Sequence, residues 1–489
     1  MCAQLSLDER RAMGTEAAIR TPLAAHRGWQ PAAGRRRPVT VLAEQEADRL
    51  PDLLPVRHGR MMISPFTFYR GAAAVMAEDL RDTPVANLSA QLCGDAHLSN
   101  FGVFGSPERR LVFDVNDFDE TLPGPFEYDV KRMVTSFTIA ARDNGFTRAE
   151  AKTAAREAAA AYRTAMASFA GLGTMDLWYA SLDEDTIRAV ARGAMDGISQ
   201  AKKSAKSAKK KKQARDQVKM AKRAAKIATR TGEKARTRDS VQALSKLGER
   251  AGGRYRIVSQ PPVVMPLREL APALAPDLSA EQIEQAIRDQ FRAYRATLRP
   301  DRRHLLEQFE IVDAARKVVG VGSVGTRAYI VLLQGRDASD PLFLQIKEAT
   351  SSVLERHLPR SRYRQHGQRV VQGQRLMQAA SDIYLGWTRG PRGRHFYWRQ
   401  LRDMKGSAAI ESMTPLGLGA YARACGWTLA RAHARSGDAV AIAAYLGEGD
   451  GFDRAMTDFA GRYADQNDRD YAEFVAAVKS GELTAVEGV

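Results

Sequence analysis

Apolar residues recur at helical spacing over several stretches of the chain and at strand spacing in one compact region. One helical face beginning after Asp129 carries Val130, Met133, Val134, Phe137 and Ala141. Ala-rich helix follows to about residue 170, and we expect further helices over residues 64–80, 280–298, 368–380, 415–434 and 453–478. Strand patterns occupy residues 87–92, 110–115, 254–266, 311–348, 383–388 and 395–401. The order of helices, a compact β-rich unit and more helices predicts an α+β protein.

Local signals mark the ends of some of these elements. Ser64-Pro65 predicts a helix start, with Ser as N-cap and Pro at the first helical position. Prolines interrupt residues 254–266, which favours an extended, edge-type strand pair. Residues 1–60 are rich in Arg and Pro with little periodicity, and predict an irregular N-terminal arm.

Composition places the 489-residue chain among ordinary globular proteins, with 44% apolar and 27% charged residues. No stretch of 18 apolar residues occurs, so we expect neither a secretion signal nor a membrane span. The three cysteines lie too far apart in sequence for a disulfide framework or a zinc knuckle. These features predict a protein of the reducing cytoplasm, and they do not indicate an oligomeric state.

Most of the net charge of +17 comes from one segment, residues 201–240, which holds 16 Lys and Arg against three acids. Ala alternates there with Lys and Arg, which favours a helix without an apolar face to bury. The segment could contact nucleic acid or another polyanion through phosphate charge. It contains no aromatic residue, so a base-stacking platform is not expected there.

The first motif with chemical content is Cys93-Gly-Asp-Ala-His-Leu-Ser-Asn100, followed by an acidic strand end at Asp114, Asp117 and Asp119. Carboxylate and amide oxygens at this spacing suit magnesium, whose shell is usually completed by substrate phosphates. One carboxylate remains to accept a proton. The alternative is that these residues only form turns and caps.

The second motif is a Gly-x-Gly-x-x-Gly loop at Gly320, Gly322 and Gly325, which includes Ser323. Strand patterns on both sides of it fit a kinase-type phosphate-covering loop better than a dinucleotide-binding loop, which requires a following helix. Lys347 lies near the end of an apolar strand after this loop, where a lysine needs a partner. We expect Glu355 to be that partner, with Glu348 as the second choice.

Together these motifs resemble the kinase-like phosphotransferases of the aminoglycoside-phosphotransferase type. That resemblance implies ATP and Mg²⁺ as cofactors, with Asp95 as catalytic base and Asn100 and Asp114 as metal ligands. Asp117 is the alternative to Asp114. It also implies that Asp129 braces the catalytic loop, while we interpret His97 as a residue that orients that loop by hydrogen bonding.

Two departures accompany the resemblance. Cys93 stands where that type usually has His, and the catalytic loop precedes the glycine loop in the chain. A reversed order is compatible with a circular permutation, because a site requires proximity in space only. The helix 421–434 resembles the one that normally leads into the catalytic loop, yet Arg435-Ser-Gly-Asp-Ala439 lacks the metal-binding Asn.

Over residues 40 to 480 the chain also resembles a bacterial domain-of-unknown-function family, numbered 2252. The similar segments are Arg60–Gly71, Cys93–Gly102, Phe113–Pro125, Lys317–Arg327, Phe343–Ala349 and Arg399–Ser407. Arg70, within the first of these, could bind a substrate phosphate or carboxylate, or form a structural ion pair.

The resemblance implies a circularly permuted, protein-kinase-like α+β fold with two lobes, a small antiparallel β lobe and a larger helical lobe. The expected units are an arm (1–60), a helical lobe with the catalytic loop (61–200), a basic insertion (201–253), a connector (254–309), the small β lobe (310–405) and helices that complete the helical lobe (406–489). The expected activity is phosphoryl transfer from ATP to an unidentified hydroxyl acceptor. The alternatives are an ATP-sensing polyanion-binding protein that uses residues 201–240, and a nucleotidyltransferase of the same fold.

Overall fold

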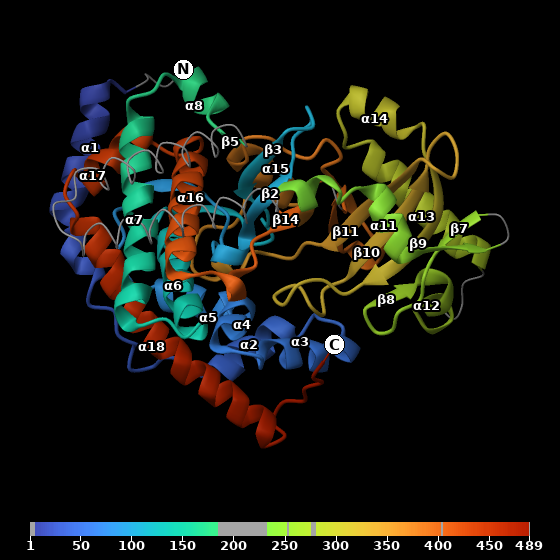
Figure 1. Ribbon diagram of the computed structural model, residues 1–489, viewed down its shortest axis with the longest axis horizontal. Coiled ribbons are helices and arrows are strands. Elements are labelled where there is room, and N and C mark those ends of the chain that lie inside the picture. The colour runs from blue at the N-terminus through green and yellow to red at the C-terminus, as the bar shows by residue number, and fades with distance from the viewer. Residues whose placement is uncertain (1–4, 184–231, 252–253, 275–279, 402–403, 489) are drawn as a thin grey trace, which may run out of the picture.

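The computed structural model describes residues 5–183, 232–251, 254–274, 280–401 and 404–488, and it has a mixed α+β architecture (Figure 1). A helical region lies on one side and a sheet with its own covering helices on the other. Most of the basic segment, and with it the predicted polyanion arm, falls outside the described residues. No helix within the described ranges combines the length and apolar character that crossing a membrane requires.

The helical region combines elements from both ends of the chain. Its helices are α1 (Leu7–Arg20), α2 (Pro38–Glu46), α3 (Leu54–Met61), α4 (Pro65–Gly71), α5 (Ala73–Leu80), α6 (Glu127–Asp143), α7 (Arg148–Ala170), α8 (Thr174–Tyr179), α16 (Pro415–Ala434), α17 (Ala439–Leu446) and α18 (Gly451–Lys479). Small residues allow α7 and α16 to pack closely, since a Cβ on Gly426 would lie 2.3 Å from the Ala158 carbonyl oxygen. The helical region therefore has one core shared by early and late segments.

A six-stranded antiparallel sheet forms the second region. Its order is β12 (Gly386–Arg389), β13 (His395–Gln400), β11 (Pro341–Glu348), β10 (Ala328–Gln334), β9 (Glu310–Lys317) and β8 (Val264–Pro266). Alternation along β10 directs Ile330 and Leu332 toward a cluster that includes α11 (Ser240–Leu247), and Val331 and Leu333 toward one that includes α13 (Ala280–Arg295). The sheet is therefore covered on both faces.

Smaller elements complete the structure. One sheet has the order β14 (Gly406–Ser407), β2 (Phe101–Gly105), β3 (Leu111–Val115) and β5 (Leu182–Asp183), and two strand pairs are β1 (Ser89–Leu92) with β4 (Leu122–Pro125) and β6 (Gly248–Ala251) with β7 (Arg254–Ile257). The remaining helices are α12 (Leu267–Leu274), α14 (Pro300–Leu306) and α15 (His366–Met377). Helix α15 contacts β12, β13, β1 and α16, so it joins the two regions.

Residues 1–60 differ from the predicted irregular arm, because they contain α1, α2 and α3. The prolines that suggested irregular backbone stand at helix starts, where a missing N–H costs nothing: Pro38 opens α2 and Pro55 lies in the first turn of α3. Val41 and Leu42 are buried in the main core. Tertiary packing therefore stabilises short helices whose own periodicity is weak.

The end of α16 lies beside β1, although about 340 residues separate them in the chain. The backbone N–H of Gln91 donates to Ser436 Oγ at 3.0 Å. A Cβ on Gly437 would lie 2.7 Å from the carbonyl oxygen of Ser89. The late helix therefore ends where the strand before Cys93 begins.

Candidate functional site

Asp129 at the start of α6 holds the first residues of the Cys93–Asn100 loop. Its carboxylate accepts hydrogen bonds from the backbone N–H groups of Cys93 at 2.7 Å and Gly94 at 3.0 Å. His433 of α16 lies 3.2 Å from the same carboxylate. Gly94 has a φ of 82°, and a Cβ there would lie 2.2 Å from the Glu120 carbonyl oxygen. These contacts fix the loop against the acidic segment that follows β3.

Asn100 connects the loop to that acidic segment. Its backbone carbonyl accepts from the N–H of Asn116 at 2.8 Å, which extends the β2–β3 hairpin by one pair. Its side-chain amide donates to the backbone carbonyl of Asp95 at 2.8 Å. Asn100 and Asp117 therefore stand at the open end of one hairpin, and the hydrogen bond to the loop uses the side-chain nitrogen of Asn100.

Lys347 joins the six-stranded sheet to the acidic segment. Its Nζ lies 2.5 Å from an Asp119 carboxylate oxygen and 3.6 Å from Asp117. Tyr397 donates its hydroxyl proton to Asp119 at 2.7 Å, and Ser323 of the glycine loop donates to Asp119 at 3.3 Å. We call these five residues the interlobe cluster. It unites segments that lie more than 200 residues apart in sequence.

Charge–charge interactions within the interlobe cluster keep Lys347 and Asp117 charged despite their burial. Burial opposes the charge of Lys347, but Asp117 and Asp119 raise its pKa above the ordinary lysine value. Burial likewise opposes ionisation of Asp117, while Lys347 and Arg399 lower its pKa below the usual range. At neutral pH the cluster therefore holds a lysine cation beside the ionised carboxylate of Asp117.

The glycine loop folds over this cluster between β9 and β10. Gly320 and Gly325 adopt positive φ angles of 65° and 88°, which favour glycine. A Cβ on Gly322 would lie 3.2 Å from the backbone oxygen of Arg70 in α4. The strand–loop–strand arrangement matches the sequence prediction, and the loop touches the helical region directly.

Arginines of α3 hold the outer side of the glycine loop. Arg57 donates to the carbonyl oxygens of Val321 at 3.1 Å and Gly322 at 2.8 Å, and Arg60 donates to Gly320 at 2.6 Å. Figure 1 shows α3 beneath the loop that leaves the sheet. These carbonyls are thereby engaged by α3, which the sequence had not assigned to the site.

Asp95 lies at the centre of the loop and is paired with Arg132 of α6. The Arg132 Nε–Asp95 Oδ1 distance is 2.8 Å, and Arg132 also donates to the Tyr69 carbonyl oxygen at 2.7 Å. His97 lies 3.7 Å from the other Asp95 oxygen. Burial lowers the pKa of His97 to about 3, so its imidazole is neutral at physiological pH.

Asp114 is placed away from the cluster. Its carboxylate is 1% exposed and lies 2.5 Å from Arg431 of α16, and it also accepts from the N–H groups of Val115 and Ala379, both at 2.8 Å. These donors occupy the carboxylate in the core. The structure therefore brings Asp117, and not Asp114, to the open end of the hairpin.

Glu355 is also placed away from Lys347. It lies in η4 (Val353–Arg356), accepts from the backbone N–H of Ser352, and lies 3.8 Å from Arg369. Glu348 pairs with Arg327 and Arg394 on the sheet. The expected Lys347–Glu355 pair is corrected to Lys347–Asp119, because the acidic segment approaches the lysine more closely than η4 does.

Tyr397 and Arg369 belong to the site but were missed in the sequence. Tyr397 stands directly opposite Lys347 in the β11–β13 register, so the two side chains share a face. Arg369 of α15 donates to the backbone oxygens of Thr121 at 2.6 Å and Asp119 at 2.8 Å. A local pattern could not reveal either role, because both depend on which strands and segments pair.

Within the described ranges, no group of three or more His, Cys, Asp and Glu side chains is arranged to hold a metal ion. Asp117 and Asn100 offer two oxygen donors at one edge of the cluster. Such a sparse set suits an ion whose remaining ligands come from elsewhere.

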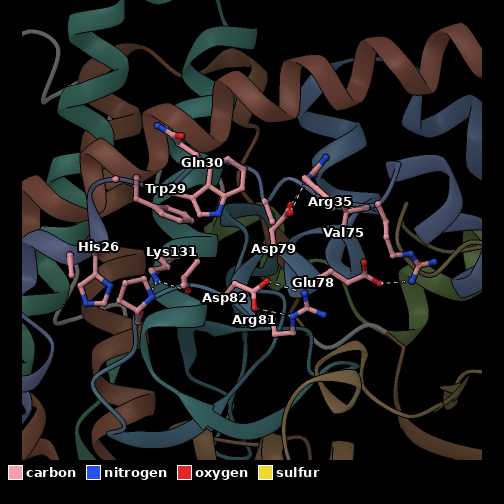
Figure 2. A pocket seen from close by; sticks show the side chains of 18 of the residues that line it. His26, Trp29, Gln30, Arg35, Val75, Glu78, Asp79, Arg81, Asp82 and Lys131 are labelled. Carbon is pink, nitrogen blue, oxygen red and sulfur yellow. Dashed lines mark hydrogen bonds and ion pairs between the residues drawn. The ribbon is translucent and has the colours of Figure 1, made fainter.

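A separate cavity of about 680 Å³ lies in the helical region (Figure 2). His26, Trp29 and Lys131 line it together with a charged rim. Lys131 donates to Thr83 Oγ1 at 2.8 Å and to the Pro84 carbonyl oxygen at 3.2 Å. None of the predicted site residues lines this cavity.

One family model matches the chain, described as an uncharacterized protein conserved in bacteria (DUF2252), over residues 49–232 and 216–477. No curated protein and no solved structure matches the chain. The matched residues include the Cys93–Asn100 motif, the acidic segment, the glycine loop and the lysine strand. The chain therefore belongs to the DUF2252 family of bacterial proteins.

Proposed function

We propose that this protein is an ATP- and magnesium-dependent phosphotransferase acting on a hydroxyl acceptor. The observation that carries the proposal is the contact of Lys347 with Asp119 and Asp117. It joins the sheet that carries the glycine loop to the acidic segment after β3. The hydrogen bond from Asn116 to Asn100 connects that segment to the loop that contains Asp95. In kinases a lysine, a glycine-rich loop, two metal-binding side chains and a catalytic Asp surround the transferred phosphoryl group.

The fold we propose is kinase-like and circularly permuted. The six-stranded antiparallel sheet would be the small lobe, and the helical region the large lobe. The position of Ser436, next to Gln91, supports the permutation, because a kinase-like helix of this kind leads directly into the catalytic-loop strand. The contact of Asp129 with the N–H groups of Cys93 and Gly94 supports the bracing role proposed for that Asp.

Asp117 and Asn100 fit the role of magnesium ligands. The carboxylate of Asp117 is 31% exposed and ionised, whereas that of Asp114 is occupied in the core. The Asn100 side-chain nitrogen binds the loop, which leaves its oxygen as the donor. Magnesium bound there would neutralise charge on the β- and γ-phosphates.

The remaining roles follow from position and charge. Lys347 would hold the α- and β-phosphates, and Ser323 with Gly320, Gly322 and Gly325 would cover them from the sheet side. Asp95 would orient the acceptor hydroxyl and accept its proton. The fixed hydrogen bonds of the loop would supply most of the catalytic effect through positioning.

Asp95→Asn tests the central assignment. We expect turnover to fall by about 10²–10⁴-fold, because the variant keeps the shape but loses the proton acceptor. Affinity for Mg·ATP should change little, since Asp95 does not face the nucleotide phosphates in this proposal. ADP release would report turnover, and the thermal shift with a non-hydrolysable ATP analogue would report binding.

The same sample can reject the proposal. A wild-type protein that shows no magnesium-dependent stabilisation by ATP, GTP or ADP would contradict it. Mass spectrometry of the labelled acceptor separates phosphoryl from nucleotidyl transfer, because the nucleotidylated product is heavier than the phosphorylated one by a nucleoside less one water. An adenylated product would leave the assignment of the site intact but show that the reaction is nucleotidyl transfer.

A further inference from the structure

Arg70 carries a half-buried charge, and its guanidinium lies 6.0 Å from the centre of the Phe66 ring. It lies near the end of α4, whose Phe66, Phe68 and Tyr69 are buried. The Arg70 Nε atom is buried and makes no hydrogen bond, and burial lowers the pKa of its guanidinium. Of the two interpretations that the sequence left open, a structural ion pair lacks a partner within 4 Å among the described residues.

The surroundings of Arg70 place it between the glycine loop and the catalytic loop. Its backbone oxygen lies against Gly322. Its side chain interacts through space with Asp95 and Glu411, and its charge helps to keep His97 neutral. Arg70 is therefore near both the proposed base and the glycine loop.

Arg132 explains why Arg70 is not simply the counter-ion of Asp95. Arg132 already pairs with Asp95 at 2.8 Å and lies over the Tyr69 ring at 3.8 Å. A second, half-buried cation beside this pair is stabilised by an anion that hydrogen-bonds to it. Asp95 and Glu411 act on Arg70 only through space, so a hydrogen-bonded anion would come from a bound molecule.

We infer that Arg70 binds an anionic group of the acceptor, so that the acceptor is a small alcohol bearing a phosphate or a carboxylate. This inference rests on the proposed function. The nucleotide phosphates have Lys347 and the glycine loop as partners, whereas the acceptor anion would have Arg70. A planar guanidinium binds phosphate and carboxylate through paired N–H donors.

The resulting reaction balances as an ordinary phosphoryl transfer. The acceptor oxygen forms a bond to the γ-phosphorus of ATP, and its proton passes to the carboxylate of Asp95. The bond between the γ-phosphorus and the β,γ-bridging oxygen breaks, and ADP leaves with that electron pair. Arg70 holds the acceptor anion throughout and exchanges no proton.

Titration of inorganic phosphate and of acetate into the full chain, saturated with a magnesium complex of a non-hydrolysable ATP analogue, tests the inference. The saturated nucleotide site prevents either anion from binding there. We expect Arg70→Gln to lower affinity for one of the anions by at least about tenfold, the loss of one charge-assisted contact. Whichever of phosphate and acetate binds more tightly shows whether the acceptor carries a phosphate or a carboxylate.

Arg336→Gln is the matched control, since it removes the same charge from an exposed arginine on the turn between β10 and β11. It should bind both anions like the wild type. Arg70→Lys keeps a cation and should recover part of the affinity, which excludes misfolding as the cause of the loss. Equal anion binding by wild type and Arg70→Gln, or no anion binding by the wild type, would overturn the inference.

Binding of the ATP analogue tests the proposed function independently of the anion titrations. If the ATP analogue fails to stabilise the chain, the phosphotransferase proposal fails. The anion titrations are then repeated without nucleotide, and Arg70→Gln retains its predicted loss. If the analogue binds but Arg70→Gln behaves like the wild type, the acceptor inference alone fails.

Discussion

The interlobe cluster and the cavity of Figure 2 each bury a lysine, but they treat its charge in opposite ways. Lys347 lies between Asp117 and Asp119, which raise its pKa. Lys131 has a hydroxyl and a carbonyl as hydrogen-bond partners, and burial lowers its pKa to about 8. Neighbouring carboxylates thus stabilise the ammonium of Lys347, whereas burial opposes that of Lys131. Our proposal places the chemistry at Lys347, where opposite charges from distant segments meet.

Replacement of each lysine by methionine provides the strongest test of this contrast. Lys347→Met should reduce turnover by about 100-fold or more, because a preorganised charge on the phosphates is lost. Lys131→Met should leave nucleotide affinity within about twofold, as expected for a distant and independent site. Nucleotide titration and ADP release measure both variants. A larger effect at Lys131 than at Lys347 would reverse the comparison.

Each of the two regions contains a buried histidine that should make stability depend on pH. Burial lowers the pKa of both His97 and His26 to about 3, whereas an unfolded histidine titrates near its ordinary value of 6.5. Below pH 6.5 the unfolded state binds more protons, so stability falls as the pH falls from 6.5 toward 3. At pH 5 each histidine should account for a loss of about 2 kcal/mol.

Chemical denaturation at pH 7 and pH 5 measures this dependence. His97→Gln and His26→Gln should each reduce the pH-dependent loss by about 2 kcal/mol. His304→Gln is the control, because that imidazole is exposed. An unchanged slope in either buried variant would show that the corresponding imidazole can be protonated in the folded state.

The smallest expected difference between the two sites concerns the loss of one tyrosine hydroxyl at each. Tyr397 donates to Asp119 at 2.7 Å in the interlobe cluster, and Tyr445 lies 2.7 Å from His26 at the cavity. Loss of either hydroxyl should lower the free energy of unfolding by about 1 kcal/mol. Only Tyr397→Phe should also lower turnover, because Asp119 then loses one of the contacts that fix it beside Lys347. Equal turnover in Tyr397→Phe and Tyr445→Phe would remove Tyr397 from the site.

Local motifs predicted much of the candidate site because short-range sequence controls loop shape. Gly94, Gly320 and Gly325 all occupy positive-φ positions within the motifs that the sequence singled out. The strand–loop–strand order around the glycines and the helix after Asp129 were likewise readable from spacing alone. Such features depend on interactions between residues close in the chain.

Local sequence patterns could not show which carboxylate of the acidic segment faces Lys347. Asp114 and Asp117 are three residues apart in one acidic segment, yet the first faces Arg431 in the core and the second faces Lys347. Which of them is buried depends on α16 and β11, which come from the other end of the chain. Pairing between segments more than 200 residues apart leaves no local pattern to follow.

Outside the first 60 residues, the sequence by itself determined the main types of element, the glycine positions and the chemical inventory of the site, because backbone preference and side-chain periodicity act over a few residues. Tertiary structure alone decided that Asp119 is the partner of Lys347, that α3 holds the glycine loop, and that the Nε of Arg70 lacks a hydrogen-bond partner. Those outcomes depend on charge and packing between distant segments. Packing in a shared core holds these distant segments in fixed positions relative to one another.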